Sequence, residues 1–403
     1  MTDDKTPQLK ILHVYQSASF SGAEAYAMEV ALHHARIHDV TFLAFKDSSL
    51  SERLAHIVSS SRHAQAGNSE SQPHFKGRLD VQTDASQVCF ESFDAVILHS
   101  TQELKSHWTK IAKAKLKSKL GLTAKAPKII VYTHIWISHS KKDPLHALTY
   151  SVVDRLWCSS ERSKKELERY IPISPKKIQV VRYGRDTAHF VQNLLSRDEA
   201  RRKLKLPQDA IVIGTIARVD QGKGSGELLH AALELMATEK KLHLLMIGPA
   251  TASDPKAVAF DKELDGTIAS LATNAPDIHS RVHKLGRLEG GSFYLPVFDL
   301  FVLATYKENF ALTLLEALLA GAPCLATNSG GSPDVVQPEK TGWLFQPASQ
   351  KALKEALILA LSEKEKWPFF SKNGRDLVVE NYDFHAVMQD MEHKLTQVLR
   401  EQP

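Results

Sequence analysis

The sequence predicts an α/β protein built from two Rossmann-like, doubly wound parallel sheets. The chain has 403 residues, more than one hydrophobic core usually organises, so two domains of roughly 150 to 200 residues are expected. Short apolar runs alternate with amphipathic stretches, which is typical of parallel strands joined by helices. The composition, with 43% hydrophobic and 24% charged residues, is that of a folded globular protein.

Buried strands are expected where several apolar residues occur together without a helical period. These runs are 9–14, 40–45, 95–98 and 128–132 in the first half, and 210–214, 244–248, 282–286, 300–304 and 324–327 in the second. Helices are expected between or after them, at 23–35, 226–236, 311–320, 367–382 and 385–399. The segment 59–86 is rich in Ser, Gln, His and Gly and has little apolar periodicity, so we predict a long loop there.

Two glutamates frame the beginning of one of these helices. Glu308 lies on the loop after the strand 300–304, and Glu316 lies two helical turns further on. The N-terminus of such a helix presents unpaired N–H groups and positive potential, so a diphosphate would fit beside it. Carboxylates accept hydrogen bonds from sugar hydroxyls, and Glu316 has mostly apolar neighbours. We therefore interpret both as ligand-binding acids; the alternative is a solvated loop acid and a helix-surface acid.

The segment around these glutamates resembles the E-x7-E signature of glycosyltransferase family 4, the retaining glycosyltransferases with a GT-B fold. The likeness continues through Phe310, Glu316-Ala317-Leu318, Gly321-Ala322-Pro323, Ser329-Gly330-Gly331, Asp334-Val335-Val336 and Gly342-Trp343-Leu344-Phe345. Ala311 departs from the pattern, because many members carry Gly or Pro there. Another departure is Tyr183-Gly184-Arg185-Asp186, where the family often has Asn-Gly-Val-Asp.

The resemblance implies a domain arrangement and a set of donor-binding residues. Two Rossmann-like domains would face a central cleft: an acceptor domain at 1–185 and a nucleotide-sugar domain at 186–382, with a C-terminal helix at 383–403 crossing back to the first. Arg218 and Lys223 match the family's R-x4-K pair, and two such cations would stabilise a departing diphosphate. Without the resemblance they would be ordinary solvated loop residues. The remaining positions carried over are Glu308 for the sugar, Glu316 for the ribose, and Gly22, Leu285, Asn309, Phe310, Ala311 and Leu312 for the donor.

A histidine directly follows the strand 128–132. His134 would stand at the carboxyl end of that strand, where a neutral imidazole can donate one hydrogen bond and accept another. The resemblance implies that it binds the donor sugar or diphosphate; His99 is the competing candidate, His139 a weaker one, and a purely structural histidine is the alternative. Nineteen histidines and three cysteines show no metal-ligand spacing, so we expect no metal, and the cysteines read as buried thiols.

The segment 105–128 has eight lysines and no acid. Trp108, Ala112, Leu116 and Leu120 would share one helical stripe beside these lysines. The segment is either an interfacial helix on an anionic membrane or a surface helix with a basic face. The lysines that would serve the membrane or the acceptor are Lys110, Lys113, Lys115, Lys117 and Lys119. A nucleic-acid partner is disfavoured, because no recognisable binding module is present.

The sequence has no apolar run of about 20 residues and no secretion signal at 1–10. We therefore expect a cytoplasmic protein, and the membrane interpretation would place it peripherally on the cytoplasmic face. The expected activity is a retaining hexosyl transfer from a nucleotide diphosphate sugar to a glycan or lipid-linked acceptor, in cell-envelope polysaccharide or lipopolysaccharide synthesis, without metal or other cofactor. The alternatives are a nucleotide-sugar 2-epimerase, a pyridoxal-dependent sugar phosphorylase and a non-catalytic GT-B-like binding protein. The four charged residues expected in the site are all present, which favours an enzyme; they are Arg218, Lys223, Glu308 and Glu316.

Overall fold

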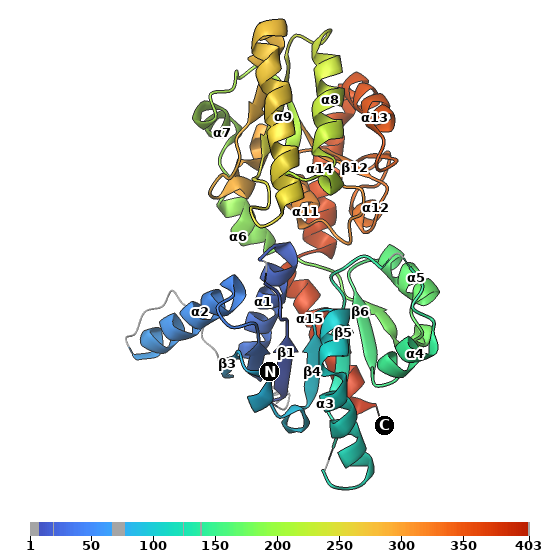
Figure 1. Cartoon of the computed structure of the whole chain (residues 1–403). Helices are drawn as coiled ribbons and strands as arrows, with labels where there is room; N and C mark the ends of the chain where they lie inside the picture. The colour runs from blue at the N-terminus through green and yellow to red at the C-terminus, as the bar shows by residue number, and fades with distance from the viewer. Residues whose placement is uncertain (1–7, 19, 67–76, 124, 138, 402–403) are drawn as a thin grey trace. The chain divides into compact units, whose positions relative to one another are not determined.

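The computed structural model describes residues 8–18, 20–66, 77–123, 125–137 and 139–401. The chain divides into two compact units. Unit 1 comprises Met1–Arg182 and Met388–Pro403, and unit 2 comprises Tyr183–Val387. Each unit has one parallel sheet covered by helices (Figure 1).

Unit 1 contains a seven-stranded sheet in which every neighbouring pair is parallel. In sheet order the strands are β3 (Leu79–Gln82), β2 (Asp39–Leu43), β1 (Lys10–Val14), β4 (Ala95–Leu98), β5 (Lys128–Tyr132), β6 (Arg155–Cys158) and β7 (Ile178–Val180). Its helices are α1 (Gly22–Ala35), α2 (Ser49–Ala66), α3 (Thr101–Lys119), α4 (Pro144–Tyr150), α5 (Glu161–Tyr170) and most of α15 (Phe384–Arg400). The sheet is doubly wound, because the strand order changes direction between β1 and β4.

Unit 2 contains a six-stranded parallel sheet. In sheet order the strands are β10 (Val282–Lys284), β9 (Leu242–Ile247), β8 (Ile211–Ile216), β11 (Leu300–Leu303), β12 (Cys324–Thr327) and β13 (Gly342–Phe345). Its helices are α6 (Thr187–Gln192), α7 (Arg197–Lys203), α8 (Ser225–Met236), α9 (Pro255–Asn274), α10 (Pro276–His279), α11 (Leu312–Leu319), α12 (Ser332–Val335), α13 (Gln350–Ser362) and α14 (Trp367–Asn381). Here the strand order changes direction between β8 and β11.

The two sheets confirm the predicted α/β class, and all nine predicted strands are present within a few residues of their expected ends. They form because their residues are buried on both faces, as in Ala95–Leu98, where all four side chains are buried. The loop predicted for 59–86 is wrong in its described parts: α2 continues to Ala66, and Leu79–Gln82 pairs with β2 as an edge strand. Residues 67–76 of that segment lie outside the described residues.

The boundary between the units follows Arg182, three residues before the end of the first domain predicted at 185. Tyr183 belongs to unit 2 because its ring packs edge-on against Phe310, with centroids 5.3 Å apart. The backbone N–H of Arg185 donates to the carbonyl of Tyr382, 2.8 Å away. At the other crossing, α15 enters unit 1 at Met388, and its apolar face is buried there.

Two further properties of the described chain concern its surface. The expectation of three buried thiols is wrong for Cys89, which is exposed, whereas Cys158 and Cys324 are buried. Among the described helices, none is both long enough and apolar enough to cross a membrane.

Candidate active site

The candidate site of unit 2 lies at the carboxyl edge of its sheet, where the strand order changes direction between β8 and β11. Loops that follow neighbouring parallel strands meet at such an edge and form the usual ligand site of an open α/β sheet. The loop after β8 carries Arg218 and Lys223, the loop after β10 carries Leu285, and the loop after β11 carries Glu308. The edge therefore brings together residues that are far apart in the sequence.

Lys223 is held by a short turn between β8 and α8. The carboxylate of Asp220 accepts a hydrogen bond from the backbone N–H of Lys223 at 2.9 Å. Gly224 follows with φ of +69°, and a Cβ there would lie 2.3 Å from the carbonyl oxygen of Ala304, so only glycine lets this turn pack against the end of β11. The turn places Nζ of Lys223 3.0 Å from Oε2 of Glu308.

Two glycines, Gly330 and Gly331, pack closely against the backbone of the loop that carries Glu308. Gly330 has φ of +54°, and a Cβ at this position would lie 1.5 Å from the carbonyl oxygen of Glu308. The backbone N–H of Gly331 donates to the carbonyl of Asn309 at 2.8 Å. The Ser329-Gly330-Gly331 motif thus holds the backbone of the loop that carries Glu308 in position. That loop lies so close to Gly330 that no side chain would fit there.

Helix α11 begins immediately after this loop. Its N-cap residue is Ala311, whose methyl side chain cannot accept a hydrogen bond from the first turn. The three residues Asn309, Phe310 and Ala311 are buried, and the ring of Phe310 packs against Tyr382 with centroids 5.8 Å apart. The N-terminus of α11 is therefore fixed in position and lacks a side-chain cap, which suits an anion.

Glu316 is buried in α11 at 5% exposure, so the surface-acid alternative is wrong. Ser292, on the 3-10 turn Gly291–Val297, donates its hydroxyl to Oε2 at 2.9 Å. Nη2 of Arg185 lies 2.5 Å from Oε1. Since a carboxylate offers about four acceptor positions, these two contacts leave capacity for the hydroxyls of a ribose.

Arg218 and Leu285 lie on neighbouring loops of the same edge. Nη1 of Arg218 is 3.0 Å from the hydroxyl oxygen of Thr251, on the loop after β9, and the Arg218 side chain is exposed. Leu285 is 39% exposed, although its backbone N–H is bonded to the carbonyl of Met246 at 3.0 Å. Both side chains are accessible to a ligand.

The remaining candidates belong to unit 1. Gly22 begins α1, and a Cβ added there would meet nothing within 4 Å, so the space beside it is open. His134 is 7% exposed, and its Nε2 lies 2.9 Å from Nδ1 of His99, so the two competing candidates are hydrogen-bonded to each other. His99 is completely buried, which leaves His134 as the one nearer to solvent; His139 is exposed.

The lysines of α3 differ in how they are used. Lys110 donates to the carbonyl of Ala85, Lys117 pairs with Glu91, and Lys115 pairs with Asp154 at 2.7 Å. Lys113 and Lys119 are exposed. Of the predicted apolar stripe, Leu116 and Leu120 are 57% and 64% exposed, whereas Trp108 and Ala112 are partly buried and pack against the core of unit 1. Part of the basic face is thus used for ion pairs within unit 1, and only the C-terminal part of the apolar stripe is in solvent.

Sequence reasoning missed Arg185, Ser292 and Glu392. The signal for Arg185 was its departure from the family pattern, which the structure explains as a counter-ion for buried Glu316. Glu392 lies in α15 beside His34 and His38, and no local pattern indicates that contact. Within the described part of the chain, no group of three or more His, Cys, Asp or Glu side chains is arranged to hold a metal ion.

Sequence profiles identify the class of protein to which this chain belongs, the group 1 glycosyltransferases. Residues 196–377 match the sequence profile of the glycosyl transferases group 1, and residues 20–189 match that of glycosyltransferase family 4. The chain belongs to glycosyltransferase family 4, which confirms the resemblance found in the sequence.

Curated relatives match parts of the chain. N-acetyl-alpha-D-glucosaminyl L-malate synthase of Bacillus anthracis is 32% identical over 34% of this chain and 35% of its own length. D-inositol 3-phosphate glycosyltransferase of Corynebacterium kroppenstedtii is 27% identical over 47% of this chain and 42% of its own. The capsular polysaccharide biosynthesis glycosyltransferase CapM of Staphylococcus aureus is 24% identical over 56% and 57%. The matched segment thus spans about a third to just over half of these relatives.

Solved structures share the fold over nearly the whole chain. Anabaena Alr3699/HepE in complex with UDP-glucose has a TM-score of 0.74 at 18% identity, covering 97% of this chain and 100% of its own. A glycosyltransferase from Rickettsia africae has a TM-score of 0.76 at 17% identity, covering 98% and 100%. These similarities support the GT-B fold.

Proposed function

We propose that the protein is a retaining hexosyltransferase that moves a sugar from a nucleotide diphosphate sugar to a glycan or lipid-linked acceptor. The observation that carries this proposal is the contact between Lys223 and Glu308 at 3.0 Å, directly before the N-terminus of α11. A cation, a carboxylate and an uncapped helix end at one sheet edge suit a diphosphate joined to a polyhydroxyl group. The complex of Anabaena HepE with UDP-glucose supports a uridine diphosphate donor.

In the proposed reaction, negative charge builds on the departing diphosphate. Lys223 and Arg218 would stabilise that charge together with the N-terminal dipole of α11. The bond between the anomeric carbon and the diphosphate oxygen breaks, the acceptor oxygen bonds to that carbon on the same face, and the hydroxyl proton passes to the leaving diphosphate. Glu308 would hold the sugar hydroxyls and Glu316 the ribose. No metal is required in this scheme, because the two cations supply the neutralising charge.

The first experiment is calorimetric binding of UDP, GDP and ADP to the full chain without added metal. We expect one nucleotide, UDP, to bind, and the Lys223→Ala, Arg218→Ala double variant to lose that binding. The control is Lys351→Ala, because the Lys351 side chain lies on α13, is 86% exposed and is not one of the candidate site residues. Equal affinity of the double variant and the unaltered protein would contradict the assigned site.

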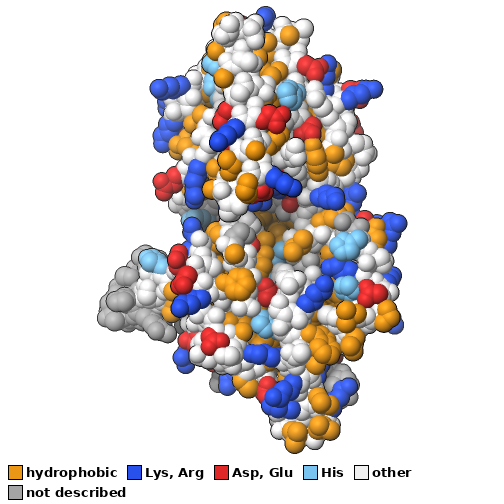
Figure 2. Space-filling view, in the orientation of Figure 1, with side chains coloured by type: hydrophobic (Ala, Val, Ile, Leu, Met, Phe, Trp, Pro, Cys, Tyr) orange, Lys and Arg blue, Asp and Glu red, His pale blue; other side chains and the backbone are white. Residues whose placement is uncertain are grey.

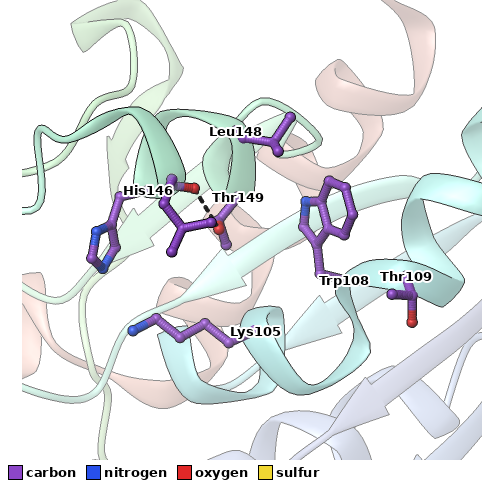
Figure 3. A pocket seen from close by; sticks show the side chains of 7 residues that line it. Lys105, Trp108, Thr109, His146, Leu148 and Thr149 are labelled. Atoms are coloured by element: carbon purple, nitrogen blue, oxygen red, sulfur yellow. Dashed lines mark hydrogen bonds between the residues drawn. The ribbon is translucent and has the colours of Figure 1, made fainter.

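We also propose that the acceptor is presented at an anionic membrane surface, on the cytoplasmic face. A pocket of about 340 Å³ lies between α3 and α4 of unit 1, lined by Lys105, Trp108, Thr109, Leu145, His146, Leu148 and Thr149. Figure 3 shows Trp108 and Leu148 along one side of it and the aliphatic stem of Lys105 below. Leu145 and Leu148, which both line this pocket from α4, are 71% and 53% exposed and form part of an apolar patch there.

The exposed apolar side chains Leu116 and Leu120, at the C-terminal end of α3, support the same proposal. Apolar side chains and basic side chains gather at the end of unit 1 where Figure 1 draws the last turns of α3 (Figure 2). Leu122, just beyond α3, is 70% exposed. Lys113 and Lys119 supply the basic part, since Lys110, Lys115 and Lys117 are engaged within unit 1. The relative CapM, named for capsular polysaccharide biosynthesis, supports a cell-envelope glycan as the context.

Vesicle sedimentation tests the membrane proposal. We expect the protein to bind vesicles that contain phosphatidylglycerol and to bind pure phosphatidylcholine weakly, because each basic side chain near an anionic surface contributes on the order of 1 kcal/mol. The Lys113→Gln, Lys119→Gln pair should weaken this binding, and Lys351→Gln should not. Equal binding to both vesicle types would refute the electrostatic part.

A further inference from the structure

The pocket between α3 and α4 combines large apolar side chains with hydrogen-bond donors. Trp108, Leu145 and Leu148 supply the apolar side chains, and Lys105 and His146 supply polar ones. Figure 3 shows the side chain of Lys105 extending from α3 toward the side on which His146 lies. A molecule that fills such a pocket needs a hydrocarbon part and a part that accepts hydrogen bonds.

Two lysines at this pocket lack an acidic partner. Lys105 lines the pocket and is exposed, and Lys141 lies on the loop between β5 and α4. Within the described part of the chain, neither ammonium group forms an ion pair. Burial lowers the pKa of Lys141, and the charge of nearby Lys105 lowers it further. Two cations that repel each other and have no counter-ion would be stabilised by a bound anion.

The acids closest in sequence to these lysines are engaged elsewhere. The carboxylate of Asp143 accepts a hydrogen bond from the backbone N–H of His146 at 3.1 Å and also lies 2.5 Å from Nδ1 of His146. Glu103 accepts a hydrogen bond from the backbone N–H of Gln16 at 2.9 Å. The positive charge beside the pocket is therefore left for a ligand.

The indole N–H of Trp108 also lacks a partner. Its Nε1 atom is buried and has no hydrogen-bond acceptor among the residues that the structure describes. An indole nitrogen can only donate, and a buried donor is usually bonded. Figure 3 draws this nitrogen on the side of the ring that faces Thr149, another residue that lines the pocket. An oxygen atom of a bound molecule would supply the acceptor that the protein does not provide.

Both walls of the pocket start from the carboxyl edge of the unit 1 sheet. Helix α3 begins at Thr101, shortly after β4, and Lys105 lies one turn later, about 6 Å along the helix axis. The loop after β5 carries His134 and leads into α4. The strand order changes direction at this edge, between β1 and β4, and ligands of open α/β sheets bind at such a point. The pocket thus lies beside the place where unit 1 would receive an acceptor.

We propose that this pocket binds the lipid phosphate of the acceptor, with one hydrocarbon chain against Trp108, Leu145 and Leu148 and the phosphate at Lys105 and Lys141. This binding mode rests on the proposed transfer to a lipid-linked acceptor, and it names the part of the acceptor that unit 1 holds. The phosphate joins the lipid to its glycan, so a phosphate held one helical turn from the sheet edge brings the first sugar near that edge.

Calorimetry with decyl phosphate, used below its micelle concentration, tests this binding on the full chain without any donor. We expect one molecule to bind, and decanol and inorganic phosphate to bind more weakly, because each fills only one part of the site. The Lys105→Gln, Lys141→Gln pair should weaken the binding of decyl phosphate about 10- to 30-fold and leave that of decanol unchanged. Leu148→Glu should weaken the binding of both.

Two control variants separate the pocket from the rest of the surface. Leu359→Glu changes a leucine of α13 that is 49% exposed, and it should leave both affinities unchanged. The Lys113→Gln, Lys119→Gln pair, which should weaken binding to vesicles, should leave the binding of soluble decyl phosphate unchanged. An equal loss in this pair and in the Lys105, Lys141 pair would overturn the proposal, because the phosphate would then have no defined site.

The indole ¹H–¹⁵N signals report on the pocket directly. The signal of Trp108, assigned by its loss in Trp108→Phe, should move when decyl phosphate is added. The signal of Trp343 should not move, because its N–H is already bonded to Glu363 of unit 2 at 2.7 Å. A Trp108 signal that stays in place while decyl phosphate binds would overturn the assignment of this pocket.

Two further outcomes would overturn the proposal. One is equal affinity for decyl phosphate and decanol, which would mean that the lysines do not bind the phosphate. The other is dihexanoyl phosphatidylglycerol binding as tightly as decyl phosphate, since the pocket would then take an ordinary membrane phospholipid. None of these measurements uses a nucleotide, so failure of the transferase assignment would appear separately, as absence of nucleotide binding in calorimetry.

Discussion

Removing Arg185 should destabilise unit 2 through the carboxylate that it leaves behind. Glu316 is 5% exposed, and its partners are Arg185 at 2.5 Å and Ser292 at 2.9 Å. Leaving a buried charge unpaired costs about 3–5 kcal/mol. The Arg185 side chain is 27% exposed, so water entering its place recovers part of this cost. For Arg185→Met we expect a loss of about 2–3 kcal/mol in the free energy of unfolding.

A double-mutant cycle isolates the interaction. Glu316→Gln removes the charge and keeps an acceptor for the Ser292 hydroxyl, so Arg185→Met should cost about 1 kcal/mol or less in that background, mainly through lost packing on the ring of Phe190. The coupling energy between the two positions should then be about 1–2 kcal/mol.

Urea denaturation of the four proteins measures this coupling. The control cycle uses Lys351→Met and Glu355→Gln, an exposed pair 3.9 Å apart in α13, whose coupling should be about zero. Additive effects of Arg185→Met and Glu316→Gln would refute the reasoning, because they would mean that Glu316 does not depend on the guanidinium.

Three other predictions follow from the same structure. Gly330→Ala should reduce the free energy of unfolding by about 2 kcal/mol or more and weaken nucleotide binding, because φ of +54° disfavours alanine and the new Cβ would collide with the carbonyl oxygen of Glu308. The control is Gly266→Ala in α9, where a Cβ would meet nothing within 4 Å. Equal effects of the two substitutions would contradict the close contact between Gly330 and Glu308. Lys223→Ala should lower kcat about 10²- to 10³-fold in a sugar-transfer assay with circular dichroism unchanged, and an unaltered kcat would remove Lys223 from the reaction. Burial raises the pKa of Glu103 to about 7, from 4.5 in the unfolded chain, so the native state holds this proton more tightly and stability is lost as pH rises from 4.5 to 7. Glu103→Gln should therefore be near neutral at pH 4 and raise the free energy of unfolding at pH 8 by on the order of 3 kcal/mol; urea titrations at both pH values measure this, and a pH-independent effect would contradict the burial argument.

Much of the fold could be predicted because buried parallel strands leave a strong local signal. Runs such as 95–98 and 300–304 are continuously apolar, since helices cover both faces of each sheet. The edge strand β3 was missed because only Leu79 of its four residues is buried, so its composition resembles a loop. The helix α2 was not predicted, and its later turns, which lie in the segment expected to be a loop, are rich in Ser, His and Gln.

The candidate site was predictable because its residues match the motifs of the family and lie on loops that follow strands. Lys223 and Glu308 lie on the loops after the neighbouring strands β8 and β11, and the structure brings their charged atoms together. Arg185 reaches Glu316 from another part of unit 2, and such a contact depends on packing that no local spacing encodes. The buried histidines His13, His34, His99 and His134 come from different elements, and only His99 and His134, which follow strands, were indicated by the sequence. The functional roles of these residues stay predictions.

Unit 1 is interrupted in sequence, since its last segment begins at Met388, after the whole of unit 2. Met388, Met391, Leu395 and Val398 are buried in that segment, so the core of unit 1 is incomplete without them. During synthesis, proteins usually fold in the order in which their domains emerge. Here unit 2 can fold before α15, which completes the core of unit 1, has been synthesised. We therefore expect unit 1 to become stable only after unit 2 has been synthesised, because α15 must first cover the face of unit 1 against which it packs.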